Sequence, residues 1–384
     1  MRGTMISILL LVCLPLSSSL ATSSPNSLVA KKDGVKLLFE FDDAKFCRIH
    51  LSDAAPPPPP STPSPVASKT ERNLEKTQLV LDYEEQVERM HLVKRAQPTI
   101  SDHLDVVYED ESVVVINKPA GVLCVPDINK NPSLLDLVWN QYGKDSKNIA
   151  ENPSSMIVNR LDMDTSGLVV FGRLPSVTRD LNEAFRERVV LKEYEALVCG
   201  HVLFDSGLID LPLQRDHEHP PFMRVSTPKS EEAAAKLIEE LKQSGYKKQG
   251  RKKSKLSQTL FRVVERLYHP NDPTLPVTRL RLKPKTGRTH QLRVHCAAIG
   301  HPIVGDATYG LSGDAAKFGG LEDAILTPLP DTSFDLQRAG LETQEGLAQV
   351  HPPNVEPMCL HAAFIRLKHP VTGETAEWMA PVPF

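Results

Sequence analysis

The stretch Asn159-Arg-Leu-Asp-Met-Asp-Thr-Ser-Gly167 runs directly into Leu168-Val-Val-Phe171, so a polar loop enters an apolar, β-branched run. The two acids, Asp162 and Asp164, lie two positions apart, and the loop conformation decides whether they face each other. Two carboxylates suit acid/base chemistry, whereas Asp-x-Asp-Thr-Ser-Gly is also typical of a plain turn with side-chain-to-backbone hydrogen bonds. From this segment alone both interpretations stay open.

Similar apolar and β-branched runs recur on both sides of this loop and predict strands. They are Leu104–Tyr108, Val113–Ile116, Tyr194–Cys199, Thr259–Leu267, Val277–Leu282, Cys359–Leu367 and Thr375–Met379. The first two, separated by Glu-Asp-Glu-Ser, are typical of a hairpin. Because helical patterns are interspersed without strict alternation, we predict an α+β fold with a mixed or antiparallel sheet, not a Rossmann fold.

Helix boundaries are indicated by capping residues. Ser133 is expected to cap a short helix, Ser176 a helix running to about Arg188, and Gly300 to end a helix that begins at Thr289. Two insertions interrupt the body, 229–255 with an expected helix over Ala233–Leu241, and 311–358, expected to be loop-like.

Composition bounds the class of protein. The chain has 384 residues, 40% hydrophobic and 24% charged, with a net charge of −3 that excludes a polycation. Residues 1–24 are typical of a targeting segment and predict an organelle, plastid or mitochondrion, with cytoplasm or nucleus as the alternative. Residues 25–100 are expected to be an extension with a Pro-rich linker, and 101–384 the catalytic domain. No apolar run is long enough to span a membrane, so we expect no integral membrane association.

Metal and cofactor sites are not indicated. The six cysteines form no CxxC pair and are expected to be reduced and buried. His290 and His295 are five apart, no HExxH is present, and His217-Glu-His219 lacks a third ligand nearby. Without a Walker or GxGxxG motif, we expect no nucleotide cofactor.

Two further segments carry polar side chains suited to chemistry. Lys192-Glu-Tyr-Glu-Ala196 places Tyr194 at a strand start, where core packing is the alternative role. Lys285-Thr-Gly-Arg-Thr-His-Gln-Leu-Arg-Val-His295 gathers basic and polar groups at a helix N-terminus, which favours anions such as phosphate.

Together these segments resemble the RluA-type pseudouridine synthases. The resemblance is carried, in order, by Asn117–Gly121, by Arg-Leu-Asp-x-x-Thr-Ser-Gly, by Lys-x-Tyr-x-Ala, by Gly287–His295 and by Gly-His-Pro-Ile-Val-Gly-Asp306. It covers roughly Leu104–Phe384. It implies a mixed, mainly antiparallel curved sheet flanked by helices, an active cleft across the sheet, and cofactor-free isomerisation of uridine to pseudouridine in RNA.

The resemblance also implies a role for each matching residue. Asp162 matches the catalytic aspartate and Arg293 the arginine that pairs with it. Tyr194 matches the tyrosine that stacks on the target base, with a part in proton removal from C5 as a second implied role. Arg160 matches an arginine implicated in base flipping, and Arg288 and His290 are expected to contact RNA. The implied partner is structured RNA, rRNA or tRNA, bound by a monomer.

The insertion 229–255 adds a basic run in which six of nine residues are lysine or arginine. We expect RNA contacts from Lys247, Lys248, Arg251, Lys252 and Lys253, with a solvated loop or a nuclear-localisation signal as alternatives.

One departure and two rival functions remain. Most relatives have histidine where this chain has Asn159, which puts the positioning of the loop in question. A catalytically silent RNA-binding or assembly factor of the same fold would lose the aspartate, tyrosine or arginine, yet all three are present. A glycoside or nucleoside hydrolase would need two placed carboxylates, and Asp164 is the only second acid nearby.

Overall fold

A computed structural model describes residues 27–32, 35–41, 46–51, 78–92, 103–127, 129–143, 152–246, 253–321 and 338–384. The expected targeting segment, the Pro-rich linker and the four basic residues from Lys247 to Lys252 lie outside these ranges.

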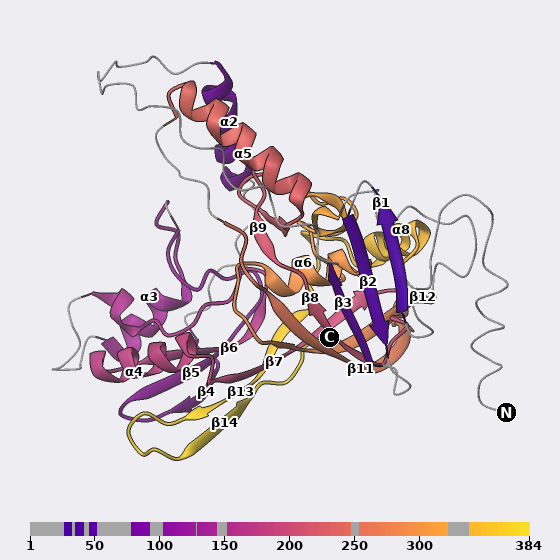
Figure 1. Ribbon diagram of the computed structural model, residues 1–384. Helices are drawn as coiled ribbons and strands as arrows, with labels where there is room; N and C mark the ends of the chain where they lie inside the picture. The colour runs from indigo at the N-terminus through magenta and orange to yellow at the C-terminus, as the bar shows by residue number, and fades with distance from the viewer. Residues whose placement is uncertain are drawn as a thin grey trace, which may run out of the picture.

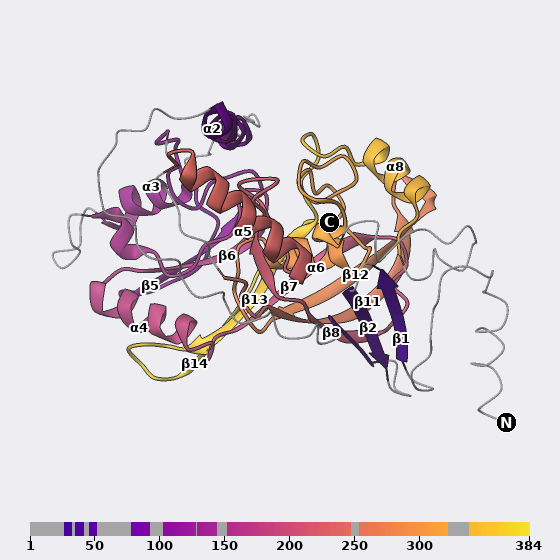
Figure 2. The ribbon, with the colours of Figure 1, turned by 45° about the horizontal axis from the view of Figure 1, so that its top comes forward.

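A 12-stranded sheet dominates the fold and follows the order β1-β2-β3-β8-β11-β12-β7-β13-β6-β5-β4, with β14 paired to β13. Ten of its strands are β1 Ser27–Lys32, β2 Val35–Phe41, β3 Phe46–Leu51, β4 Val106–Glu109, β5 Val113–Lys118, β6 Ser166–Gly172, β7 Leu191–Cys199, β8 Ser206–Asp210, β13 Leu360–Lys368 and β14 Thr375–Met379. The two longest strands are β11 Gln258–His269 and β12 Asp272–Pro284, which Figure 2 shows bending along their length. The pairs β13–β6 and β3–β8 are parallel and the others antiparallel, which confirms the predicted class.

Some of the helices pack against this sheet, whereas those at 78–92 and 228–243 project away from it (Figure 1). They are α2 Gln78–Leu92, α3 Leu134–Val138, α4 Pro175–Arg186, α5 Pro228–Gln243, α6 Gln291–Ala298 and α8 Leu341–Val350, with short π or 3₁₀ turns at Trp139–Gly143, Pro153–Met156 and Lys317–Gly320. A small second sheet pairs β9 Leu213–Arg215 with β10 Met223–Val225. No helix among the described ranges is both long and apolar enough to cross a bilayer.

The β5 and β6 strands explain why the central runs are apolar throughout rather than alternating. Val114 and Phe171 pack into a core with α3, while Val115 and Val170 pack on the opposite face with α4. A strand buried on both faces needs apolar residues at every position. The loop that ends in β6 is therefore anchored to a strand that is buried throughout.

Several predicted boundaries are confirmed and others are wrong. The β4–β5 hairpin, the cap at Ser133 and the left-handed Gly300 after α6 are confirmed. Ser176 does not cap α4, because Leu174 is the N-cap and Pro175 occupies the first helical position, where proline is well tolerated.

The segment 311–358 is not simply loop-like, since it contains α8. Its pattern is weakened by Gly346, and glycine disfavours a helix in water. A side chain at that position would lie 2.6 Å from Leu275, so tight packing accounts for the glycine.

The predicted boundary at residue 101 divides the sequence but not the sheet. Strand β3, from the N-terminal extension, pairs in parallel with β8, and its residues Cys47 and Ile49 are buried in the main core. The two ends of the strand order, β1 and β4, lie at opposite sides of Figure 1.

Candidate active site

The loop that carries Asp162 is fixed from beneath by a buried lysine. Lys118, at the end of β5, donates hydrogen bonds of 2.8 Å to the carbonyls of Pro119, Val122 and Met163. Burial lowers the pKa of this lysine to about 8. Three carbonyl acceptors satisfy the three donors of an ammonium group, so Lys118 ties the loop at 119–122 to the catalytic loop.

Asn159 holds the other end of the same loop. Its side-chain Oδ1 accepts a 2.8 Å hydrogen bond from the backbone N–H of Val170 in β6. The turn is then closed by the Thr165 N–H, which donates to the carbonyl of Asp162 over 3.1 Å. The amide of Asn159, which cannot titrate near neutrality, thus positions this loop where most relatives have a histidine.

Tyr194 lies on the central strand β7, in register with Leu282 of β12 and Ala362 of β13. Burial, and secondarily the charge of Asp162, raise its pKa well above the ordinary value, so the phenol stays protonated at neutral pH. It borders the same hollow as Asp162 and is not simply a core residue.

Arg293, the arginine expected to pair with Asp162, lies on helix α6. Arg293 is 3% exposed and makes a two-pronged contact with Asp306, Nε to Oδ2 at 2.8 Å and Nη2 to Oδ1 at 2.7 Å. Its Nη1 lies 3.8 Å from Oδ2 of Asp162. The expected pairing with Asp162 is therefore present as a longer ion pair, while the close hydrogen bonds go to Asp306.

Asp306 is itself fully buried and held by the backbone. Its Oδ1 accepts hydrogen bonds from the N–H groups of Thr308 and Tyr309, at 2.8 and 3.0 Å. Burial alone would raise the pKa of this carboxyl, but the charge and hydrogen bonds of Arg293 outweigh it and lower the pKa. In return Asp306 raises the pKa of Arg293 against the opposing effect of burial.

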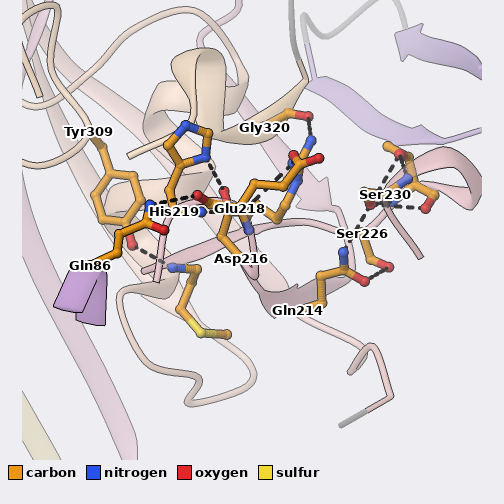
Figure 3. A network of polar contacts seen from close by, with 12 residues as sticks. Gln86, Gln214, Asp216, Glu218, His219, Ser226, Ser230, Tyr309 and Gly320 are labelled. Atoms are coloured by element: carbon orange, nitrogen blue, oxygen red, sulfur yellow. Dashed lines mark hydrogen bonds and ion pairs between the residues drawn. The ribbon is translucent and has the colours of Figure 1, made fainter. Parts of the chain in front are cut away.

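His290 is the N-cap of α6 and adopts a left-handed backbone conformation, φ 53°. Its Nδ1 lies 2.8 Å from the Tyr309 hydroxyl, which accepts a hydrogen bond from the Met223 N–H, while its Nε2 lies 3.9 Å from Asp162. In Figure 3 a dashed line joins the Tyr309 hydroxyl to the backbone nitrogen that donates this hydrogen bond. Burial lowers the pKa of His290, so the ring is neutral near pH 7.

Two other residues of the 285–295 segment face inward and not toward a ligand. Gln291 bonds Thr286 and Thr259, and His295 bonds Thr259 and the carbonyl of Leu211. Burial lowers the pKa of His295 to about 4. These two side chains attach α6 to β11.

One pocket brings most of the predicted site together. Its lining includes Arg160, Asp162, Tyr194, Arg288, His290 and Arg293. The two described members of the basic run, Lys253 and Lys255, are exposed and do not line this pocket.

Three residues that hold the site in place, Lys118, Asp306 and Tyr309, were not assigned a role from the sequence. Lys118 and Asp306 belong to the motifs Asn-Lys-Pro-Ala-Gly and Gly-His-Pro-Ile-Val-Gly-Asp, so their signal was present without an assigned role. Tyr309 belongs to none of these motifs, and its contacts with His290 and the Met223 N–H join distant segments.

The loop 216–219 has a third candidate ligand, Asp216, next to the His217-Glu-His219 segment. Asp216, Glu218 and His219 have ligand atoms within 4.8 Å of one another (Figure 3). However, Asp216 already accepts hydrogen bonds from the N–H groups of Glu218 and His219, and Arg224 lies 3.0 Å from Glu218. A buried arginine beside the carboxylates accounts for this cluster as a hydrogen-bonded turn.

Comparison with known proteins shows which family the chain resembles. The RNA pseudouridylate synthase family profile matches residues 112–298. The dual-specificity RNA pseudouridine synthase RluA of Vibrio vulnificus is 37% identical over 221 residues, covering 58% of this chain and 74% of the relative. RluA of Haemophilus influenzae is 31% identical over 287 residues, 75% of this chain and 97% of the relative. A solved structure, human RNA pseudouridylate synthase domain containing 1, aligns with a TM-score of 0.47 at 25% identity, covering 75% of this chain and 86% of that one.

The family profile and these relatives identify an RNA pseudouridine synthase, an isomerase that acts on RNA. Within that class, the chain belongs to the RluA-type family.

Proposed function

We propose that this protein isomerises specific uridines of rRNA or tRNA, with Asp162 as the group that acts on the ribose. One observation carries the proposal. Asp162, Tyr194 and Arg293 come from three distant segments yet line a single pocket, with Arg293 3.8 Å from the aspartate.

In the proposed reaction the target base is first extruded into the pocket, at a cost of about a few kcal/mol, and Arg160 at the rim assists. The Asp162 carboxylate then adds to C1′ as the N1–C1′ bond breaks, or promotes that cleavage through a glycal; either route needs an ionised carboxylate facing the sugar. The uracil rotates and C5 bonds to C1′ as the ester bond between Asp162 and C1′ breaks, or, on the glycal route, as C2′ regains the proton it lost. The C5 proton is then lost and N1 gains a proton. The product is an isomer, so atoms and electrons balance.

Tyr194 is assigned to stacking on the base. Its raised pKa keeps it protonated at neutral pH, which favours stacking over removal of the C5 proton. Arg293 provides a fixed positive charge beside Asp162, an arrangement in which the charge need not reorganise during reaction.

The choice of rRNA or tRNA follows the relatives, which include a "dual-specificity" enzyme and the "ribosomal large subunit pseudouridine synthase D" of Escherichia coli, 34% identical over 283 residues. Mapping pseudouridines across all RNAs in cells with and without this protein tests it. Loss of defined rRNA or tRNA sites is expected, and an unchanged map would contradict the proposal.

We also propose that the protein acts as a monomer and that residues 1–24 direct it to an organelle. Light scattering on the purified protein tests the first, and a dimer mass would contradict it. A fluorescent fusion of residues 1–24 tests the second, and diffuse fluorescence through the cell would contradict it.

A further inference from the structure

A groove leads away from the catalytic pocket, between the end of α4 with the turn into β7 and the turn from β12 into α6. It encloses about 720 Å³. Lys192, Thr286, Gly287 and Arg288 line both the groove and the catalytic pocket, so the two hollows are continuous.

The groove is lined by cations. Six of its 14 lining residues are basic and none is acidic, and all 14 lie within the described ranges. The six are Arg186, Arg188, Lys192, Lys283, Lys285 and Arg288. Among them, Arg186 contacts Glu183, which is not a lining residue, over 3.0 Å.

Two of these cations, Lys192 and Arg188, repel each other. Lys192 is half-buried, and burial first, then the charge of Arg188, lower its pKa. Positive charges held close together in a partly desolvated hollow are destabilised, and an anion bound between them would relieve that cost. The groove is thus electrostatically prepared for phosphate.

The groove also has an apolar side. Phe185 lies beneath Lys192, with the ammonium 5.5 Å from its ring centre, and Val189 is 69% exposed at the turn after α4. Arg188, beside Val189, has a positive φ of 61°, a conformation uncommon for a residue with a side chain. Cations interleaved with an aromatic ring and exposed apolar surface are typical of grooves that bind single-stranded nucleic acid.

We propose that this groove binds unpaired RNA flanking the target uridine, with phosphates contacting Arg188 and Lys285 and a base packing near Phe185 and Val189. This inference rests on the proposed function. It adds the direction in which the strand leaves the pocket and requires the flank to be unpaired. Lys253 and Lys255, the described members of the basic run, do not line the groove.

The test uses the double variant Arg188→Ser/Lys285→Ser, because both side chains are exposed and lie outside the catalytic pocket. The matched control is Arg262→Ser/Lys368→Ser, which removes the same charges at exposed positions outside both hollows. The probes are a labelled oligouridylate of about 20 nucleotides, long enough to span such a groove, and a fully paired RNA hairpin of similar length.

We expect the groove variant to bind the oligouridylate about tenfold more weakly at moderate salt. The slope of log affinity against log salt should fall by about 1.4, for two lost phosphate contacts on a single strand. The control variant and binding of the paired hairpin should change little. An unchanged slope, an equal loss with the control, or an equal loss on the hairpin would overturn the inference.

Pseudouridine formation on cellular RNA is measured with the same preparations. If wild-type protein forms pseudouridine while the groove variant keeps wild-type affinity, only the groove inference fails. If wild-type protein forms none on any RNA, the proposed function fails whatever the binding shows.

Discussion

Arg293 makes close hydrogen bonds to the carboxylate of Asp306 and a longer ion pair with that of Asp162. Asp306 takes the short hydrogen bonds at 2.7 and 2.8 Å, whereas Asp162 is 3.8 Å away and keeps its lone pairs free of this guanidinium. A carboxylate that must react with a sugar benefits from a nearby positive charge that does not occupy the reacting oxygen. Asp306 is therefore a positioning residue that holds the charge in place before RNA arrives.

Asp306→Asn tests this arrangement. The amide cannot balance the buried guanidinium, so Arg293 should turn toward Asp162 and cover its oxygens. We expect kcat to fall by about 100-fold, comparable to the loss of one preorganised donor, while the Kd for RNA changes less than about threefold. Single-turnover kinetics and RNA binding, run below the melting temperature of the variant, measure both.

The control for that variant is Asp314→Asn, an exposed aspartate in the same region of the chain. It should leave kcat unchanged. A wild-type kcat in folded Asp306→Asn would show that the close contact with Arg293 has no part in catalysis.

The sequence motifs singled out Asp162, Tyr194 and Arg293, which line one pocket, but not the residues that hold them in place. Residues with their own motif positions can be matched one by one. The contacts of Lys118 with Met163, 45 positions away, and of Tyr309 with His290 depend on how distant segments meet. Such contacts become visible only in the folded chain.

Among the elements, strands were easier to predict than helices and caps. The runs at 113–116 and 168–171 are buried on both faces, so their composition alone indicates a strand. Short strands such as β9, with three residues, carry too little pattern. The first turn of α4 begins with Pro175 after an apolar N-cap, so its start lacked the polar cap that the prediction relied on.

The α6 helix gives a pH-dependent prediction. His295 is buried and neutral, with a folded pKa of about 4 against an ordinary value near 6.5. The unfolded chain therefore binds more protons between these values, and stability is lost as the pH falls from about 6.5 toward 4. At pH 4 this single group should cost about 3 kcal/mol of unfolding free energy.

His295→Gln isolates that contribution, since an amide can bond both Thr259 and the Leu211 carbonyl without titrating. Urea unfolding at pH 7 and at pH 4 should show that the wild type loses about 3 kcal/mol more than the variant. Equal losses in the two proteins would mean that His295 is not the titrating group.

For the whole molecule, the unexpected feature is that the N-terminal strands join the main sheet. Pairing of β3 with β8 joins residues about 160 positions apart and is parallel, so no local turn signal announces it. The sequence of β3 does not indicate which strand is its partner. The main sheet thus extends beyond the segment that resembles the family.

Removal of residues 1–51 tests how much the pairing of β3 with β8 contributes to stability. The truncation takes away the buried Cys47 and Ile49 and exposes the backbone of β8 as a sheet edge. We expect a lower melting temperature and aggregation on heating. Removal of residues 1–24 alone, which leaves β1–β3 in place, should behave like the full chain, and equal stability of the two truncations would contradict the pairing.

The central claim is that this molecule isomerises uridine through Asp162. It is tested most directly by incubating RNA from cells that lack the protein with purified wild type, Asp162→Ala and Asp164→Ala, and analysing the nucleosides by mass spectrometry. Wild type and Asp164→Ala should form C5-linked pseudouridine without free uracil, and Asp162→Ala should form none while still binding RNA. Pseudouridine from Asp162→Ala at the wild-type rate, or free uracil from the wild type, would contradict the account.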